Sequence, residues 1–597
     1  MVEECLSRVP ERLCEVSVCP QPECFDALPE LVRVRWHIRA ATARAAGLSV
    51  ITAADWLRFS QTGDRAQYEA LYFSRRRRLT DLVCGVLSGA PENCMDAVLD
   101  TVWGICEESA WQLPAHNGYV RDAPQLSWPD VENPVVDLFA AETGALLACT
   151  CAALRDMLPE AVHRRVRFEV ERRILVPCST MHFWWMGGGD EPLNNWTPWC
   201  TQNVLLCVFA LPFSQQMRHA VIVQAAHSLD CFLKDYGHDG CCNEGAQYYT
   251  HAGLCLFGCL ELLYTAAPSA FEGLWREQKI QNIAAYIYCM HVDGPYYVNF
   301  ADCSPFAGRR GAREYLFALR TENPDMARFA AQDWRAGLTS PDENGDIARI
   351  NLWYQLLEAR AASDMNRAAN APPPVPSGDI YYPSVGVFFV RRGGWCLAAK
   401  AGCNADSHNH NDTGSVILYR YGKPFLIDVG VETYTKKTFS DQRYEIWTMQ
   451  SQWHNLPTFG GVQQQAGAAF RAQDVRTAFS GNDAEISMEL SAAWPAEARL
   501  ERFTRTVRLE KAGFTLYDVC SGEYETAFLS LMLCEAPQAD GCRIRVGALG
   551  TLFFEGACGP IETDTLPITD ARLRIAWPAV LYRLRIPFTS KLMVKAE

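Results

Sequence analysis

The chain has 597 residues, of which 49% are hydrophobic and 21% are charged, and its formal net charge is -14. This composition excludes a disordered tail, a fibre and a small disulfide-stapled scaffold. The negative balance argues against broad binding of nucleic acid or of an anionic membrane, because both need clustered cations. No apolar run reaches the roughly 18 residues that a membrane-spanning helix requires. We therefore expect a soluble protein with neither nucleic acid nor membrane as a partner, and we leave a homo-oligomer open.

The start of the chain bears on where the protein works. Its first five residues, Met1-Val2-Glu3-Glu4-Cys5, lack the cationic segment and the apolar run of a secretory signal. Together with 25 cysteines, this predicts a reduced, cytoplasmic protein. A secreted or periplasmic protein is the alternative if a leader has been removed.

Residues 1–370 have the apolar periodicity of helices. One stripe, with steps of three and four residues, comprises Met95, Val98, Leu99, Val102, Trp103 and Cys106. Within a similar pattern, the run Arg75 to Arg78 is interpreted as a solvated helix face rather than as a polyanion site. Serial helices over a segment of this size predict an (α/α) toroid rather than one small bundle.

Consecutive prolines at residues 371–378 predict an extended linker, because proline cannot continue a helix. From residue 379 to 597 the apolar period becomes two. Residues 503–509 and 514–517, separated by Lys511-Ala512-Gly513, predict a hairpin, and residues 572–575 and 582–586 repeat the strand pattern. Many short strands predict an antiparallel β-sandwich, so the fold class is a helical toroid followed by a β-sandwich.

The first third of the predicted β domain gathers several histidines. His408 and His410 would share one face of an extended segment, and Asp428 ends an apolar run where an unpaired carboxylate would be costly to bury. His410, Asp428 and His454 are therefore a candidate metal site, completed by solvent or a fourth protein group. The spacing alone favours hydrogen-bonded loop residues, because it lacks the short repeat of a metal motif.

Two groups of short motifs carry a resemblance to a known enzyme family. One group lies in the predicted β domain and comprises His408-Asn409-His410-Asn411-Asp412, Gly422-Lys423-Pro424-Phe425-Leu426-Ile427-Asp428-Val429-Gly430, Tyr434 and His454-Asn455-Leu456-Pro457. The other lies in the helical part and comprises Asn194-Asn195-Trp196 and Asp239-Gly240-Cys241-Cys242-Asn243-Glu244-Gly245-Ala246-Gln247-Tyr248-Tyr249. Together they resemble the heparinase II/III-like polysaccharide lyases, which combine a helical toroid with an antiparallel β-sandwich. The first 150 and the last 100 residues carry no specific motif.

The resemblance implies β-elimination of a glycosidic bond next to a uronic acid, which leaves an unsaturated sugar. The C5 proton is only weakly acidic, so the C6 carboxylate must be neutralised before negative charge develops beside it. Asn195 and His408 match the neutralising pair of the family. Tyr248 matches the catalytic tyrosine, which can act as base and acid if the proton and the leaving group share one face, and Tyr249 is its alternate.

Further site residues follow from the resemblance. Tyr434 matches a tyrosine that faces the site and could assist proton transfer. Arg443 could bind a carboxylate or a sulfate, or form an ion pair within its domain. Glu244 could orient Tyr248 or the substrate, or be structural. Many relatives have histidine where this chain has Trp196, which puts a histidine base at that position in doubt and leaves Trp196 to stack on a sugar or to pack.

The resemblance also assigns one zinc ion, mainly supporting the β-domain site, to His410, Asp428 and His454. The implied partner is an anionic, uronate-containing polysaccharide or oligosaccharide, with glycosaminoglycans preferred. Three alternatives stay open. They are an alginate or oligoalginate lyase, an inactive carbohydrate-binding protein, and a toroid glycoside hydrolase with paired carboxylates from Asp190, Glu191, Asp239 and Glu244.

Overall fold

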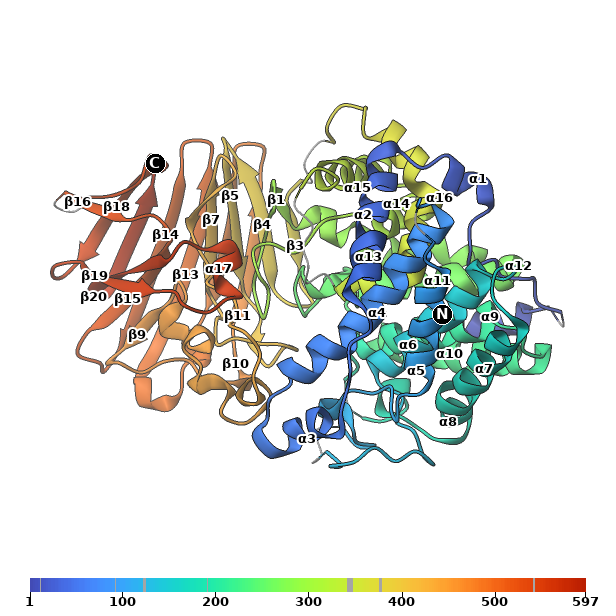
Figure 1. Cartoon of the computed structure of the whole chain (residues 1–597). Helices are drawn as coiled ribbons and strands as arrows, with labels where there is room; N and C mark the ends of the chain where they lie inside the picture. The colour runs from blue at the N-terminus through green and yellow to red at the C-terminus, as the bar shows by residue number, and fades with distance from the viewer. Residues whose placement is uncertain are drawn as a thin grey trace. The chain divides into compact units, whose positions relative to one another are not determined.

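The computed structural model divides the chain into two compact units (Figure 1). Unit 1 comprises Met1–Tyr236, Thr250–Ala284 and Arg309–Val375, and unit 2 comprises Gly237–Tyr249, Ala285–Gly308 and Pro376–Glu597. The structure describes residues 1–10, 12–91, 93–121, 125–190, 192–340, 347–374, 378–540 and 543–597. Glu191 and residues 375–377 of the predicted linker lie outside the described residues. Within the described part of the chain, no helix is long and apolar enough to cross a membrane.

Unit 1 is helical, as the sequence predicts. Two central helices, α6 and α9, are buried on nearly all sides, and Asp137 caps α6 by accepting a hydrogen bond from the backbone N–H of Ala140. The α helices are α1 (Pro22–Asp26), α2 (Glu30–Ala46), α3 (Ala53–Thr62), α4 (Ala66–Leu87), α5 (Met95–Cys106), α6 (Leu138–Ala153), α7 (Glu160–Val170), α8 (Val176–Thr180), α9 (Trp196–Ala210), α10 (Gln215–Asp235), α11 (Gly253–Ala266), α12 (Pro268–Phe271), α13 (Gln278–Cys289), α14 (Ala312–Arg320), α15 (Pro324–Gly337) and α16 (Leu352–Ala368). Of these, α13 contains the unit boundary that follows Ala284.

Helix α5 confirms one prediction and corrects a detail. The helix spans the predicted stripe, and Val98, Val102 and Cys106 are buried. Trp103, however, is 71% exposed, because the buried face also takes in Thr101 and Ile105 and is rotated away from position 103.

Unit 2 contains two main antiparallel sheets that share one apolar core. The five-stranded sheet has the order β3 (Ile380–Tyr382), β4 (Val387–Arg392), β5 (Trp395–Lys400), β7 (Val416–Arg420) and β8 (Lys423–Leu426). The main path of the eleven-stranded sheet is β11 (Gln473–Phe479), β12 (Asp483–Glu489), β13 (Leu500–Glu510), β14 (Phe514–Gly522), β20 (Val580–Ala596), β18 (Gly550–Ala557), β17 (Arg543–Val546) and β16 (Pro537–Asp540). Beside this path lie β9 (Pro457–Phe459), β15 (Ala527–Leu533) and β19 (Glu562–Pro567). Phe388 and Leu397 from one sheet and Val507 from the other belong to the same core, as in a sandwich.

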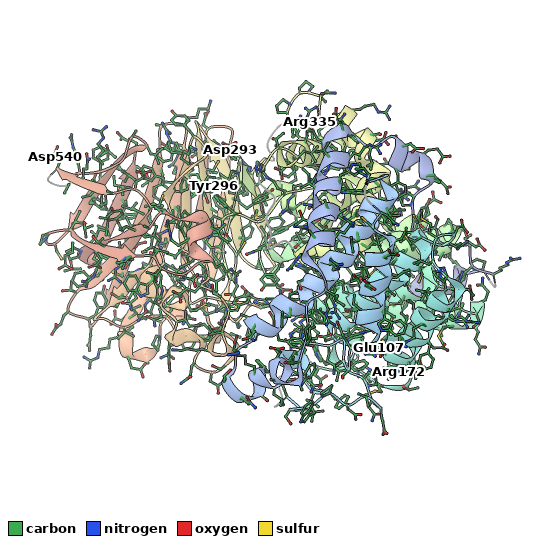
Figure 2. The ribbon with its side chains drawn as sticks, viewed as in Figure 1. Glu107, Arg172, Asp293, Tyr296, Arg335 and Asp540 are labelled. Atoms are coloured by element: carbon green, nitrogen blue, oxygen red, sulfur yellow. The ribbon has the colours of Figure 1, made fainter. Side chains whose placement is uncertain are left out.

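Two small two-stranded sheets complete unit 2, and the second of them is a hairpin. Strand β6 (Cys403–Asn404) pairs with β10 (Gly467–Arg471), and β1 (His291–Asp293) pairs with β2 (Tyr296–Tyr297). Asp293 and Tyr296, which are labelled in Figure 2, pair across this hairpin, and the Tyr296 ring lies 5.6 Å from the Tyr419 ring of β7. A segment that precedes the linker thus packs on the five-stranded sheet.

Two of the predicted strand regions are confirmed by the structure, and one is wrong. The hairpin is confirmed, because β13 and β14 pair with Leu509 opposite Phe514, and residues 582–586 lie in β20. The predicted strand at residues 572–575 is wrong, since α17 (Leu573–Ala576) begins there. The Asp570 carboxylate accepts hydrogen bonds from the backbone N–H groups of Arg572 and Leu573, and this cap favours a helical turn over an extended strand.

Candidate functional site

Three segments of unit 2 that are far apart in the sequence meet at one polar cluster. Residues 237–249 supply Glu244 and Tyr248, residues 285–308 supply Asp302, and the main body of the unit supplies His408 and Tyr434. The backbone N–H of Asp302 donates to the carbonyl oxygen of His408 at 3.1 Å, which joins two of these segments directly.

Asp302 lies at the centre of the cluster, and the sequence analysis did not identify it. Its fully buried carboxylate accepts hydrogen bonds from His408 Nδ1 at 3.0 Å, His410 Nε2 at 3.0 Å, Tyr434 Oη at 3.2 Å and Arg443 Nη2 at 2.6 Å. Burial alone would raise the pKa of Asp302, but hydrogen bonds from the two histidines outweigh it and hold the pKa well below its ordinary value. The carboxylate is therefore ionised.

The hydrogen bonds set the direction of the tyrosine pair. The hydroxyl oxygens of Tyr248 and Tyr434 are 2.6 Å apart, and Tyr434 donates its hydrogen to Asp302. The oxygen of Tyr434 must then accept the hydrogen of Tyr248, because each phenol has a single hydrogen to donate. The lone pairs of the Tyr248 oxygen can then accept a further hydrogen bond, and the oxygen can take up a proton once the phenol is ionised.

His408 is held by charge, by ring stacking and by an unusual backbone. Its Nε2 lies 3.3 Å from Glu244, and its ring stacks on Tyr248 with centroids 4.4 Å apart. Burial would lower the pKa of His408, but hydrogen bonds with Asp302 and Glu244 outweigh it and raise the pKa to about 9. The imidazole therefore carries positive charge at neutral pH. Its backbone has φ 57°, a left-handed conformation that is costly for a residue other than glycine and that clusters at functional sites.

Arg572 is a second residue that the sequence analysis missed. Its guanidinium carbon lies 4.5 Å from the centre of the Tyr434 ring, and its Nη2 donates to Gln247 Oε1 at 3.2 Å and to the carbonyl of Asp302 at 3.3 Å. Burial raises the pKa of both Tyr248 and Tyr434, and the charge of Arg572 opposes the rise. Arg572 is thus a nearby cation able to stabilise a phenolate.

Arg443 donates hydrogen bonds to several groups within unit 2. Besides Asp302, it donates to the carbonyl oxygens of Asn409, at 3.2 and 2.9 Å, and of Thr438, at 3.1 Å. Of the two interpretations from the sequence, this geometry favours the ion pair within the domain. Binding of a carboxylate or sulfate by Arg443 stays a prediction.

His410, Asp428 and His454 form a group that could hold a metal ion. Their side chains are buried, and their ligand atoms lie within 4.8 Å of one another. His454 Nδ1 lies 2.8 Å from Asp428 Oδ2, and the backbone N–H of Gly430 donates to Asp428 Oδ1 at 2.9 Å. His410 Nδ1 and His454 Nε2 are buried without a hydrogen-bond partner among the described residues. Two unpartnered imidazole nitrogens beside a carboxylate fit a cation such as zinc.

The other three predicted residues are Tyr249, Asn195 and Trp196. Tyr249 is buried, with its ring 5.7 Å from that of Tyr286. Asn195 and Trp196 belong to unit 1, where Asn195 precedes α9 and is 4% exposed. The Trp196 ring lies 4.9 Å from His116 and 5.2 Å from Trp184, so it has packing partners. The roles predicted for these three residues stay predictions.

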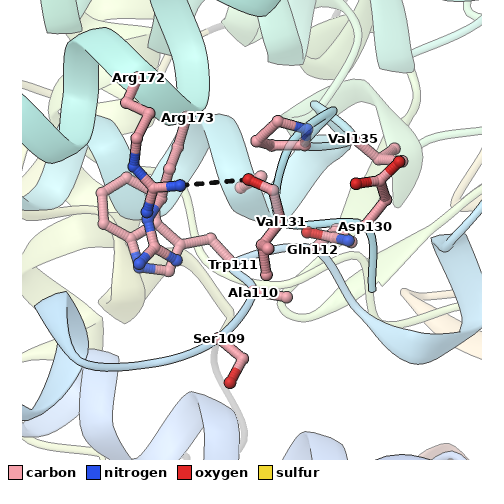
Figure 3. Close-up of a pocket in the computed structure, with 11 residues that line it drawn as sticks. Ser109, Ala110, Trp111, Gln112, Asp130, Val131, Val135, Arg172 and Arg173 are labelled. Carbon is pink, nitrogen blue, oxygen red and sulfur yellow. Dashed lines mark hydrogen bonds between the residues drawn. The ribbon is translucent and has the colours of Figure 1, made fainter. Parts of the chain in front are cut away.

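A small pocket in unit 1 contains none of the predicted site residues (Figure 3). Its lining includes Trp111, Arg172 and Arg173, and Arg172 donates to the carbonyl oxygen of Val131. Both arginines pair with the carboxylate of Glu169, at 2.9 and 2.7 Å. Their charge is thereby offset within the protein.

Comparisons with known proteins agree with this architecture. Residues 374–546 match the family model described as Heparinase II/III-like, C-terminal. One structure named heparinase III is 13% identical and has a TM-score of 0.56, and the match covers 88% of this chain and 76% of the heparinase III chain. Another has a TM-score of 0.55 at 14% identity, over 90% and 79% of the two chains. A chondroitin AC lyase of Streptomyces coelicolor A3, solved in complex with chondroitin sulphate, is 11% identical and has a TM-score of 0.50. The match covers 96% of this chain and 82% of the lyase chain.

No curated protein sequence matches the chain significantly. At such low identities the structural matches establish the fold, and they confirm the predicted helical toroid followed by an antiparallel β domain. The match of residues 374–546 to the heparinase II/III-like C-terminal family model confirms the resemblance that the histidine and aspartate motifs of that segment carry.

Proposed function

We propose that the protein is a polysaccharide lyase that cleaves uronate-containing polysaccharides or oligosaccharides by β-elimination. The observation that carries the proposal is the hydrogen-bonded set of Tyr248, Tyr434, Asp302 and His408 in unit 2. The family match supports the enzyme class, and structures named heparinase III and chondroitin AC lyase share the fold. These names support a glycosaminoglycan as the preferred substrate, with alginate as the alternative.

The charge of His408 suits the first requirement of the reaction. Negative charge develops next to the C6 carboxylate when C5 loses its proton, so a cation against that carboxylate lowers the barrier. His408 has a pKa of about 9 and is positive at neutral pH. In this proposal His408 Nε2, which lies 3.3 Å from Glu244, exchanges that partner for the substrate carboxylate and neutralises it, and Asn195 keeps the assisting role that the resemblance implies.

Tyr248 suits the proton transfers. Its oxygen accepts the C5 proton, the C5–H electron pair forms the C4–C5 double bond, and the C4–O4 bond breaks with its electron pair on O4. A proton from Tyr248 then neutralises O4. The tyrosine must first be ionised; the charge of Arg572 lowers the pKa of Tyr248, and the positive ring of His408 stacks on it, so both lower the cost of that phenolate. Tyr434, whose hydroxyl oxygen lies 2.6 Å from that of Tyr248, holds the ring in register.

Zinc is the metal that we propose for His410, Asp428 and His454. When bound, it would neutralise the Asp428 carboxylate and hold the histidine segment in place. The proton transfers above use the side chains of the protein alone.

The direct test is incubation of the protein with hyaluronan, chondroitin, heparan and alginate. Elimination creates a double bond conjugated to the carboxylate, and the ultraviolet absorbance of that bond is followed over time. New reducing ends without this absorbance would contradict the lyase proposal and favour the hydrolase. Saccharide binding with neither signal would favour the inactive binding protein.

Replacement of Tyr248 by phenylalanine tests the assigned base. We expect Tyr248→Phe to lower kcat by about 10² to 10⁴, the range for a general acid or base, with the fold and metal content unchanged. The matched control is Tyr419→Phe, which removes the hydroxyl of a buried tyrosine in β7. Full activity in Tyr248→Phe would overturn the assignment and direct suspicion to Tyr249 or Tyr434.

A further inference from the structure

Asp302 connects two histidines to which the sequence assigns different tasks. Its Oδ2 lies 3.0 Å from Nδ1 of His408, and its Oδ1 lies 3.0 Å from Nε2 of His410. The side chains of Asp302 and His410 are fully buried, so water does not compete for these bonds. A shift of this one carboxylate therefore moves both imidazoles.

The chemistry of the carboxylate fixes which nitrogen of each ring faces it. An ionised carboxylate only accepts hydrogen bonds, so Nε2 of His410 and Nδ1 of His408 must donate. His410 Nδ1 then keeps its lone pair, and it is the buried nitrogen without a hydrogen-bond partner among the described residues. A histidine that donates through one nitrogen to a carboxylate and keeps the other for a metal is the usual arrangement around metal sites.

The backbone around Asp302 reinforces this connection. Ala301, which precedes Asp302, has φ 65°, and His408 has φ 57°. Each of the two segments that meet here therefore has a non-glycine residue in the left-handed region. Such conformations persist only where the surroundings hold them. The hydrogen bond from the Asp302 N–H to the His408 carbonyl and the bonds of Arg443 to Asp302 and Asn409 supply that restraint.

We propose that Asp302 is a positioning residue that couples the metal site of His410, Asp428 and His454 to His408. A cation bound at that site fixes His410, His410 fixes the carboxylate of Asp302, and the carboxylate fixes the ring of His408. The inference rests on the proposed function, because it takes His408 as the group that meets the substrate carboxylate. It goes beyond that function in making the metal site control the orientation of His408.

The first experiment measures zinc binding by itself. Wild-type protein and Asp302→Asn are loaded with zinc, and release to a chromophoric chelator is followed. Asparagine keeps the size but loses the charge and one acceptor oxygen, so we expect release to be about 10 to 100 times faster. The control is Asp564→Asn, which removes a carboxylate of unit 2 that pairs with Arg583. Release at the wild-type rate from Asp302→Asn would overturn the inference.

The second experiment measures coupling to the reaction. We expect kcat of Asp302→Asn at saturating zinc to fall by about tenfold or more, with a smaller change in KM. Removal of zinc should lower kcat of the wild type, and it should change kcat of Asp302→Asn much less, because the connecting bonds are already lost. An equal loss of kcat in both proteins on zinc removal would contradict the coupling.

A further variant keeps the inference testable if Asp302→Asn does not fold. Coupling is reciprocal, so His408→Ala, which leaves every proposed metal ligand in place, should also speed zinc release, by about twofold or more. Unchanged release from a folded His408→Ala would count against the proposal. If the wild type eliminates none of the polysaccharides, the proposed function fails, whereas the zinc-release rates still decide whether Asp302 couples the two histidines.

Discussion

Two buried carboxyl groups show how surroundings decide the charge of a side chain. Asp302 in unit 2 receives hydrogen bonds from His408, His410 and Arg443, and its pKa lies well below the ordinary value. Glu142 in unit 1 is 3% exposed and accepts a hydrogen bond from Asn351 at 2.8 Å, a neutral donor. Burial therefore prevails at Glu142 and raises its pKa from 4.5 to about 8. At neutral pH the first group is ionised and the second is protonated.

The raised pKa of Glu142 predicts how stability depends on pH. Between about pH 4.5 and 8 the unfolded chain loses the Glu142 proton and the folded protein keeps it, so the contribution of Glu142 to stability falls as the pH rises. Glu142→Gln cannot ionise and should lose this dependence. From pH 5 to pH 8 the variant should gain at least about 1 kcal/mol over the wild type, since one pKa unit corresponds to about 1.4 kcal/mol. Thermal or urea unfolding measures it, and parallel pH curves would contradict the prediction.

At the scale of the element, the β13–β14 hairpin contacts the backbone close to two of the proposed metal ligands. Arg505 and Asp518 face each other across the two strands, and their side chains form a fully buried ion pair with distances of 2.8 and 2.7 Å. Arg505 also donates to the carbonyl oxygens of Gly414 and Asn455, at 2.8 Å each. Gly414 lies four residues after His410, and Asn455 directly follows His454. An element that the sequence predicts well thus restrains two of the three segments that carry the proposed metal ligands.

Breaking this pair should therefore cost stability. In Asp518→Asn the guanidinium of Arg505 stays buried without its counter-charge, and we expect the free energy of unfolding to fall by about 3 kcal/mol. Asp483→Asn is the matched control, because Asp483 pairs with Arg508 where both side chains are partly exposed, and little change is expected. Denaturant unfolding followed by circular dichroism distinguishes the two. Equal stability of Asp518→Asn and wild type would show that the pair is dispensable.

At the scale of the whole molecule, the linear division at the proline linker does not coincide with the compact units. Residues 237–249 and residues 285–308 both precede the linker, the first range by more than a hundred positions. Both nevertheless belong to unit 2. They bring Tyr248 and Asp302 to residues that follow the linker. The proposed metal ligands all lie in the last part of unit 2, so metal loading should change the local stability of that unit more than that of unit 1.

Metal removal should then have a local effect. We expect a chelator to increase amide hydrogen exchange in peptides that contain His410, Asp428 and His454, because a bound ion stabilises the folded arrangement of its ligands. Peptides from α6 and α9 of unit 1 should exchange at unchanged rates. His410→Ala should show the same pattern without the chelator. Exchange measured by mass spectrometry gives both results, and a uniform increase along the chain would contradict the prediction.

The interpretation of Arg75 to Arg78 shows where local pattern fails. The sequence suggests a solvated helix face, but Arg75, Arg76 and Arg78 are buried in α4, and Arg76 is only 1% exposed. Arg75 and Arg76 pair with Glu108, at 2.9 and 2.6 Å. The partner acid is more than 30 positions away, and nothing in the local run indicates that it exists.

The sequence by itself determined the fold class and the residues that belong to short motifs. Period 3.6 and period 2 follow from which faces of helices and strands are buried, and His408, His410, Asp428 and His454 lie within motifs that can be read along the chain. Only the tertiary structure decided that Asp302 and Arg572 join the site. Asp302 is 106 positions from His408 and 270 from Arg572, and Arg572 is 325 from Gln247. Contacts over such separations depend on how strands and connecting segments pack, which no local pattern encodes.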